Sequence, residues 1–173
     1  MTATAHHSST EKNQFLDTFE REHATTVKVL RAYPKGKESL QPHEKLKSAA
    51  GLAWIFVGEM GMLEKALTTG FDWSKPPEMP AAPATLDEVI AAFDHLHKQV
   101  VETVTAMSPA QLHDETVTFP SGPGQMGTPT KMQFLWFVLS DQIHHRGQFS
   151  VYLRMAGGKV PSIYGPTADE PWM

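Results

Sequence analysis

The sequence predicts an all-α protein, a bundle of four helices, and three observations support this fold class. Four segments carry apolar residues at helical spacings of three and four, and no segment carries a strong strand pattern. The composition, 40% hydrophobic and 20% charged residues, is that of a globular protein. A chain of 173 residues makes one domain of ordinary size with one core. Amphipathic helices without strands bury their apolar faces best in a bundle.

The first helix is predicted at residues 11–32, after a flexible tail at residues 1–10. The residues of its apolar face are spaced by four and three along the chain: Phe15, Phe19, His23, Val27 and Leu30. This spacing places them along one side of a helix. Pro34 and Gly36 end the helix, and residues 11–173 are expected to form the single domain.

Two more helices are predicted before residue 110. The second helix, at residues 46–67, is apolar nearly all round, as expected for a helix that packs on several sides. A proline-rich linker at residues 76–83 follows it. The third helix, at residues 85–106, begins with a capping box formed by Thr85 and Glu88.

The fourth helix is predicted at residues 130–156, where Gly157 and Gly158 end it. A long connection precedes it, with no sustained helical pattern and at most a short extended segment at residues 115–119. Residues 159–173 contain three prolines, so we expect an extended C-terminal tail that wraps over the bundle.

Composition and charge exclude several classes of function. The chain has no cysteine, which excludes disulfides, thiolate metal sites and a cysteine nucleophile. Its net charge is −4 and its 15 Lys and Arg residues are scattered, so nucleic acid is not expected as a partner. The longest apolar stretch, residues 52–57, is far shorter than the ~20 residues that cross a bilayer. Because the polar N-terminus also lacks a secretory signal, we expect a cytoplasmic protein without a membrane partner.

Asp141 and His145 are the strongest candidates for a functional site. They lie one turn apart within the apolar face of the fourth helix, so both side chains can reach one point, as helical metal ligands commonly do. Polar groups on an apolar face need partners, because burying them unpaired is costly. Two structural alternatives stay open, and periodicity alone favours them over a metal: the pair hydrogen-bonds internally, or Asp141 pairs with Arg146.

Four other residues of the helices are notable. Glu59 interrupts the apolar line of the second helix and could complete a three-ligand site, although its position alone favours an edge location with the carboxylate in water. His95 and His97 are expected at the surface or rim, because residues two apart point to different helix faces. Gly147 within a helix indicates the close approach of another helix backbone.

Two runs near the C-terminus are similar to the signature of the DinB and YfiT-like family: Ile143 to Arg154 and Lys159 to Glu170. The stretch from Lys47 to Trp54 resembles the same family more weakly, so the resemblance covers nearly the whole chain. It implies an up-down-down-up four-helix bundle, often dimeric, with a divalent metal held by three histidines. One of these histidines lies on the second helix, and two lie four residues apart on the fourth.

Residue by residue, the resemblance places the last metal ligand on His145. The ligand four residues earlier falls on Asp141, which can still bind a metal, while the second-helix ligand falls on Ile55, or on Trp54 in a neighbouring register, and neither can. Glu59, one turn beyond Ile55, is the nearest group that could substitute. With Glu59, three protein ligands could bind Zn²⁺ or Ni²⁺. With Ile55 alone only two ligands remain, and the family register favours this second arrangement.

The resemblance implies a small-molecule binding protein or a weak small-molecule enzyme, with an altered or degenerate divalent-metal site. Relatives include transferases and isomerases that use low-molecular-weight thiols, whose pKa the metal lowers. We therefore expect a thiol-dependent transferase or a metal-dependent hydrolase. The alternative is a non-catalytic dimeric structural or stress-response bundle that has lost metal binding. A homodimer through helix faces is expected from the resemblance and from the surplus of apolar positions on the second helix.

Overall fold

Four long helices make up most of the computed structural model, which describes residues 10–75 and 80–173. Their bounds confirm the predicted helices to within three residues: α1 (Glu11–Arg31), α2 (Ala49–Leu67), α3 (Leu86–Ala106) and α5 (Lys131–Met155). The predicted tail before residue 10 and part of the proline-rich linker, residues 76–79, lie outside the described residues. None of the described helices combines the length and the apolar character that a membrane span requires.

Side-chain caps explain where the long helices begin. Thr10, Ser48, Thr85 and Thr130 each accept a hydrogen bond from the backbone N–H three residues later. The predicted capping box of Thr85 and Glu88 is present. At the other end of α5, Gly157 adopts a φ of 82°, and the N–H of Gly158 donates to the carbonyl of Leu153 at 3.0 Å, which ends the helix as predicted.

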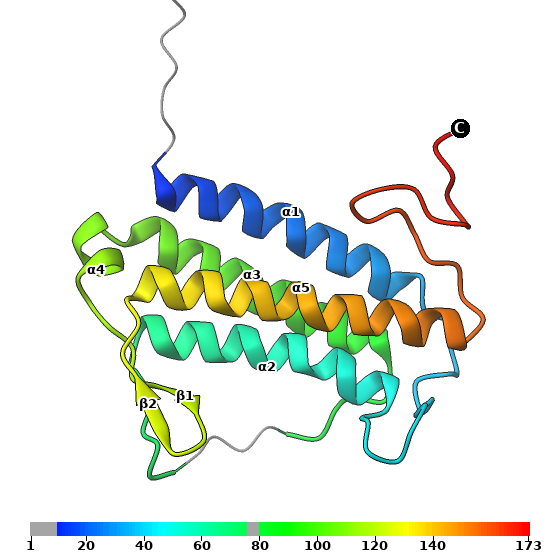
Figure 1. Cartoon of the computed structure of the whole chain (residues 1–173), viewed down its shortest axis with the longest axis horizontal. Coiled ribbons are helices and arrows are strands. Elements are labelled where there is room, and N and C mark those ends of the chain that lie inside the picture. Colours follow the sequence, from blue (N-terminus) through cyan, green and yellow to red (C-terminus); the bar gives the residue numbers. More distant parts are fainter. Residues whose placement is uncertain (1–9, 76–79) are drawn as a thin grey trace, which may run out of the picture.

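The helices pack in an up-down-down-up order around one core. α1 contacts α3 and α5, and α2 contacts the same two helices, so α1 and α2 occupy opposite corners. Figure 1 shows that α2 and α3 run parallel to each other and opposite to α1 and α5. Fully buried phenylalanines from all four helices fill the centre: Phe15, Phe19, Phe56, Phe93, Phe134 and Phe149. The four-helix bundle predicted from the sequence is confirmed.

The connection between α3 and α5 contains more structure than its sequence pattern indicated. It forms a short helix, α4 (Pro109–His113), and an antiparallel hairpin of β1 (Phe119–Gly122) and β2 (Gln125–Gly127). A capping box of Ser108 and Gln111 and a proline in the first turn start α4, but five residues are too few to show a periodicity. The predicted extended segment continues as the first strand of this hairpin.

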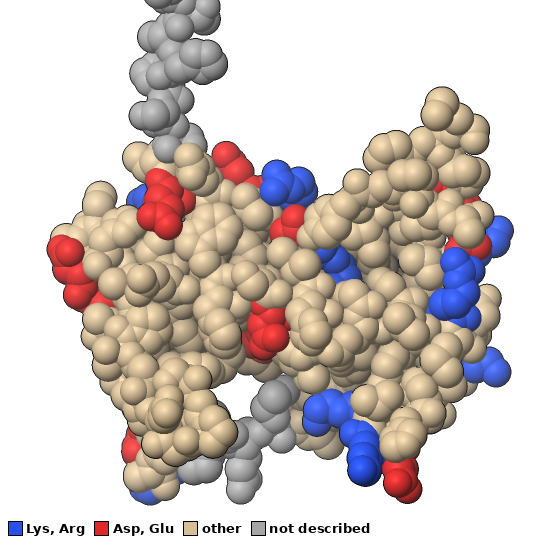
Figure 2. All heavy atoms as spheres, viewed as in Figure 1, with Lys and Arg blue, Asp and Glu red and all other residues tan. Residues whose placement is uncertain are grey.

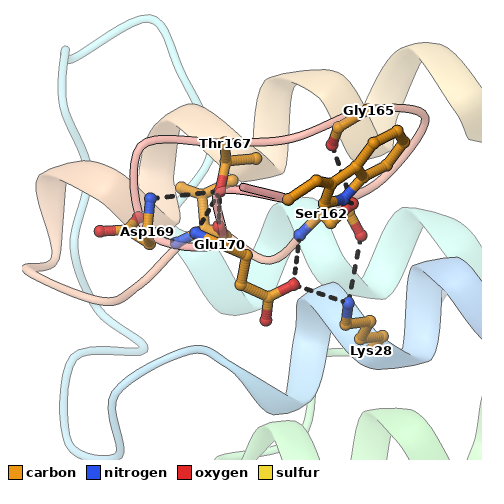
Figure 3. A network of polar contacts seen from close by, with 8 residues as sticks. Lys28, Ser162, Gly165, Thr167, Asp169 and Glu170 are labelled. Atoms are coloured by element: carbon orange, nitrogen blue, oxygen red, sulfur yellow. Dashed lines mark hydrogen bonds and ion pairs between the residues drawn. The ribbon is translucent and has the colours of Figure 1, made fainter.

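The C-terminal tail packs back on α1, as expected. Figure 3 shows Lys28 of α1 donating to the carboxylate of Glu170 at 3.0 Å and to the carbonyl of Ser162 at 3.2 Å. Within the tail, the backbone N–H of Ser162 donates to the same carboxylate at 2.7 Å, and the Thr167 hydroxyl accepts from the N–H of Glu170 at 3.1 Å. These contacts fold the tail into a loop against the bundle.

A buried ion pair joins α1, α5 and the tail. The guanidinium of Arg146, only 2% exposed, donates to Oε2 of Glu22 at 2.7 Å and to the hydroxyl of Thr26 at 3.3 Å. The hydroxyl of Tyr164, from the tail, contacts both charged groups. The predicted alternative in which Arg146 pairs with Asp141 is therefore wrong, because the arginine points to α1 rather than along its own helix.

Two predictions about single helix residues are also wrong. His97 is buried instead of lying at the rim, because its ring stacks on His23 of α1 with centroids 3.7 Å apart. Gly147 does not mark a close helix crossing: it is exposed, and a Cβ added there would meet no described atom within 4 Å. The other histidine of that prediction, His95, is exposed as expected.

Candidate functional site

Two neighbouring helices bring together the three residues that the sequence singled out. Glu59 of α2 and His145 of α5 meet across the helix contact, with 2.6 Å between Oε1 of Glu59 and Nδ1 of His145. Asp141, one turn before His145, places Oδ1 3.9 Å from the same nitrogen. One ligand atom from each residue lies within 4.8 Å of the other two. The residues therefore form a cluster of two carboxylates and one imidazole.

Glu59 is buried, which corrects the expectation that its carboxylate lies in water. Only 5% of the residue is exposed, and burial raises the pKa of its carboxyl to about 7 although the hydrogen bond with His145 acts in the opposite direction. Its second oxygen, Oε2, is buried without a hydrogen-bond partner among the described residues. An unpaired buried oxygen is costly, so it marks a position where a further group could bind.

The imidazole of His145 responds to the same contact. The hydrogen bond with Glu59 raises the pKa of His145, while burial acts in the opposite direction. Ile55, the position favoured for the second-helix ligand, is half-buried and lines the neighbouring cavity. Glu59, one turn further along α2, is the residue that reaches His145, so the favoured two-ligand arrangement with Ile55 alone is wrong.

A cavity of about 810 Å³ opens beside this cluster. Its walls are largely apolar and come from α2, from the segment after α2 and from the β1–β2 hairpin: Trp54, Ile55, Met62, Phe71, Trp73 and Phe119. Figure 2 shows the surface hollowed beside the hairpin. Ligand pockets of small molecules have this size and this mixture of apolar walls with a few polar groups.

Two tryptophans hold the walls of this cavity in place. The indole N–H of Trp54 donates to the carbonyl of Pro80 at 2.9 Å, and that of Trp73 donates to the carbonyl of Thr118 at 2.8 Å. Phe119 packs against Trp73 with ring centroids 5.5 Å apart. Trp73 and Phe119 were not predicted as wall residues, because they lie in segments without a helical pattern, where periodicity gives no signal.

The cluster suits a divalent metal by its donor chemistry and spacing. Zinc accepts histidine nitrogen and carboxylate oxygen at about 2.0–2.2 Å, so ligand atoms around one tetrahedral ion lie about 3.3–3.6 Å apart. The contacts of 2.6 Å and 3.9 Å at His145 lie on either side of this range, and all three ligand atoms lie within 4.8 Å of one another, so shifts on the order of 1 Å would accommodate an ion. The unpaired oxygen of Glu59 adds a further donor.

Charged side chains of both signs lie on the face that contains the cavity. Figure 2 shows most of the acidic side chains over the left half of this face and most of the basic ones over the right half. The cavity itself contains charges of both signs, because Lys47 and Lys65 line it together with Glu59 and Asp141. A ligand of this cavity therefore meets carboxylates and ammonium groups at separate positions.

Comparisons with known proteins agree with the arrangement of the helices. A solved DinB-like protein from Bacillus cereus superposes with a TM-score of 0.71 at 22% identity, covering 87% of this chain and 95% of that one. A DinB-like protein from Bacillus subtilis, YjoA, superposes with a TM-score of 0.67 at 17% identity, covering 87% and 97% of the two chains. At these identities the likeness shows the fold.

The sequence comparisons extend over nearly the same length. The uncharacterized protein YrdA of Bacillus subtilis (strain 168) is 24% identical over 158 residues, which cover 91% of this chain and 90% of that protein. The DinB family matches residues 8–172, which include all four long helices and the cluster of Glu59, Asp141 and His145. The chain therefore belongs to the DinB family.

Proposed function

We propose that this protein is an enzyme that acts on a small molecule with the help of one divalent metal held by Glu59, Asp141 and His145. The observation that carries the proposal is the convergence of these three side chains at one edge of a largely apolar cavity, with an unpaired oxygen on the buried carboxylate. Zn²⁺ and Ni²⁺ both accept nitrogen and oxygen ligands of this kind.

The residues of the chain divide the work of the proposed reaction. Glu59 and Asp141 supply negative charge that attracts a cation, and His145 adds a neutral nitrogen donor from the same helix face as Asp141. A bound divalent metal would lower the pKa of a water or a low-molecular-weight thiol, which becomes the nucleophile. The apolar walls exclude bulk water and orient the electrophile. Thiol-dependent transfer and hydrolysis are the reactions that this arrangement supports.

Charge distinguishes this proposed site from one built of three histidines. Two carboxylates neutralise a divalent ion, whereas three neutral imidazoles leave it with its full positive charge. We therefore expect weaker activation of the nucleophile than a three-histidine site would give. The hydrogen bond between Glu59 and His145 supports a second candidate, a bundle in which the two residues satisfy each other and no metal binds.

Metal titration separates these two candidates. We expect metal-free protein to bind one Zn²⁺ or Ni²⁺ per chain in calorimetry, and we expect His145→Ala and Glu59→Gln each to lower the affinity about 100-fold or more, since each removes a ligand. Elemental analysis of the purified protein gives an independent count. His144→Ala is the matched control, because His144 is the adjacent residue, is exposed and bonds to Gln148.

Three results would contradict the proposed site. If the protein binds no metal in the presence of excess Zn²⁺, the second candidate, the bundle without a metal, is correct. Uptake that His145→Ala and His144→Ala reduce equally would place the metal elsewhere. Uptake that is lost in His145→Ala but retained in Glu59→Gln would remove Glu59 from the ligand set.

Association of two copies is a separate proposal. The apolar residues of α2 are mostly buried inside the bundle, whereas Phe137, Val151 and Met155 are exposed on the outer face of α5. We expect the protein to sediment as a dimer at roughly tens of micromolar, and Val151→Lys to shift it to monomers, since a buried unpaired charge opposes association. Met126→Lys on the hairpin is the control. A wild-type protein that sediments only as a monomer would contradict the dimer.

A further inference from the structure

Two glycines occupy the middle of α2 beside the cluster of Glu59, Asp141 and His145. Gly58 and Gly61 lie nearly one turn apart, and both line the cavity. Glycine is the least favourable helix residue after proline, because it loses the most backbone freedom. Close packing of another element commonly compensates, but a Cβ added at Gly61 would meet no described atom within 4 Å. The volume above Gly61 is thus left to the cavity.

Flat apolar surfaces border this bare stretch of helix. Trp54 and Met62 flank it on α2, and Phe71 and Trp73 face it from the segment that follows α2. All four side chains are only half-buried. Both indole N–H groups already donate to backbone carbonyls, so the tryptophan rings offer the cavity apolar faces rather than donors. Such walls suit the apolar part of a ligand, and a flat aromatic ring most of all.

One ammonium group lies next to this apolar stretch. Lys65 follows Gly61 by one turn of α2 and lines the same cavity. Lys35 and Lys131 pair with carboxylates at 2.9 Å and 2.7 Å. The amine of Lys65 is exposed and lies within 4.0 Å of no carboxylate of the residues that the structure describes, although hydrogen bonds and, more weakly, the charge of this amine lower the pKa of the Asp72 carboxyl. An ammonium at the edge of an apolar cavity and without a close ion pair is suited to an anionic group.

The positions of the charges set the orientation of a ligand. Lys65 lies six positions after Glu59 on α2, which is about 9 Å along a helix axis at about 1.5 Å per residue. An anionic group at Lys65 therefore stays away from the two carboxylates of the cluster, while the opposite end of a longer molecule can extend toward the cluster, because Lys65 and the cluster line the same cavity. A cationic end group at Lys65 would be repelled.

We propose that the cavity binds a small organic anion, whose flat apolar body lies over Gly61 and whose carboxylate, or a similar group, pairs with Lys65. The proposal rests on the proposed function, because it names the substrate class of the same site. The cavity volume of about 810 Å³ leaves room for such a molecule together with a small nucleophile.

A matched pair of probes tests the charge preference. We expect metal-free wild-type protein to bind 2-naphthylacetate at least about tenfold more tightly than the neutral 2-naphthylacetamide in calorimetry, since the two differ only in the group that meets Lys65. Lys65→Met is expected to abolish this difference and to leave amide binding unchanged. Lys47→Met removes the other ammonium that lines the cavity, and this variant is expected to keep the preference for the acid over the amide.

A second variant tests the glycine. Gly61→Leu is expected to weaken the binding of both probes at least about tenfold by filling the space, while raising the Tm by about 2–4 °C because leucine is the better helix residue. Gly147→Leu is the control, because Gly147 is also open and helical but lies outside the cavity, so it should raise the Tm and leave binding unchanged.

The possible failures of the two proposals can be told apart. Each of three results would overturn the anion site, with or without metal uptake. The wild type could bind the acid and the amide equally, or Lys47→Met instead of Lys65→Met could lose the preference for the acid. The third result is unchanged binding of the probes by Gly61→Leu. If the probes bind as expected while no variant takes up Zn²⁺, the metal proposal fails and the anion site stands.

Discussion

Replacing Glu22 by Gln is expected to lower the free energy of unfolding by about 3–5 kcal/mol, because it leaves a buried arginine without its counter-charge. Arg146 is 2% exposed and Glu22 is 5% exposed, so water cannot take the place of the lost carboxylate. Burial by itself would raise the pKa of Glu22, but hydrogen bonds from Tyr164 and Arg146 outweigh it and lower the pKa. The folded state therefore holds the carboxylate charged. Urea denaturation monitored by circular dichroism measures the loss.

Two further variants give this prediction its controls. Arg154→Gln removes an ion pair with Asp169 whose arginine is half exposed, and it should cost at most about 1 kcal/mol. The double variant Glu22→Leu with Arg146→Met removes both buried charges and should recover much of the loss. If Glu22→Gln lowers the free energy of unfolding no more than Arg154→Gln does, the charge of Glu22 does not stabilise the buried pair.

Acid is expected to destabilise the protein through the stacked pair of His23 and His97. Burial lowers the pKa of His23 to about 4, with a smaller contribution from the neighbouring His97, and the hydrogen bond with Asp94 opposes this. Burial likewise lowers the pKa of His97. Oε2 of Glu20 is 3.2 Å from Nε2 of His97, without the alignment of a hydrogen bond. The folded state thus disfavours the charged form of both rings.

The sign of the effect follows from proton binding in the two states. Between an unfolded pKa of about 6.5 and a folded pKa of about 4, unfolded His23 binds a proton that the folded protein does not, so stability falls as the pH falls through this window. The shift corresponds to about 3 kcal/mol between pH 7 and pH 4 for His23 alone.

The measurement compares the unfolding free energy at several pH values in two variants. His23→Phe keeps an aromatic ring against His97 but cannot bind a proton, so its stability should fall less steeply below pH 6.5 than that of the wild type. His95→Phe replaces an exposed histidine of α3 and should leave the wild-type pH dependence in place. Parallel pH curves for the wild type and His23→Phe would contradict the prediction.

The helices were predictable because local chemistry specifies them. Thr10 and Thr85 begin helices through caps that involve residues only three positions away, and Gly157 ends α5 through its own backbone angle. The short α4 and the β1–β2 hairpin were not predicted, because they are too short for this kind of evidence. Elements of three to five residues contain too few positions to reveal a period, and their stability depends on what they pack against.

Errors in the candidate residues arose where a partner lies far away in the sequence. The pattern of α5 could not show that Arg146 reaches Glu22, 124 residues earlier, instead of Asp141 on its own helix. It likewise could not show that His97 is covered by the ring of His23 on another helix. Periodicity identifies which residues share a face, but the neighbour that covers this face is decided by the packing of all helices together.

The sequence by itself determined the four helices and the alignment of Asp141 with His145, because a spacing of four fixes both side chains on one face of a helix. Only the tertiary structure decided that Glu59, 86 residues before His145, turns inward and completes the cluster instead of lying in water. The physical reason is that a carboxylate can be buried only where a partner compensates its lost hydration, and that partner belongs to another helix. The cavity follows the same rule, since its walls come from α2, the segment after it and the hairpin, which meet only in the folded chain.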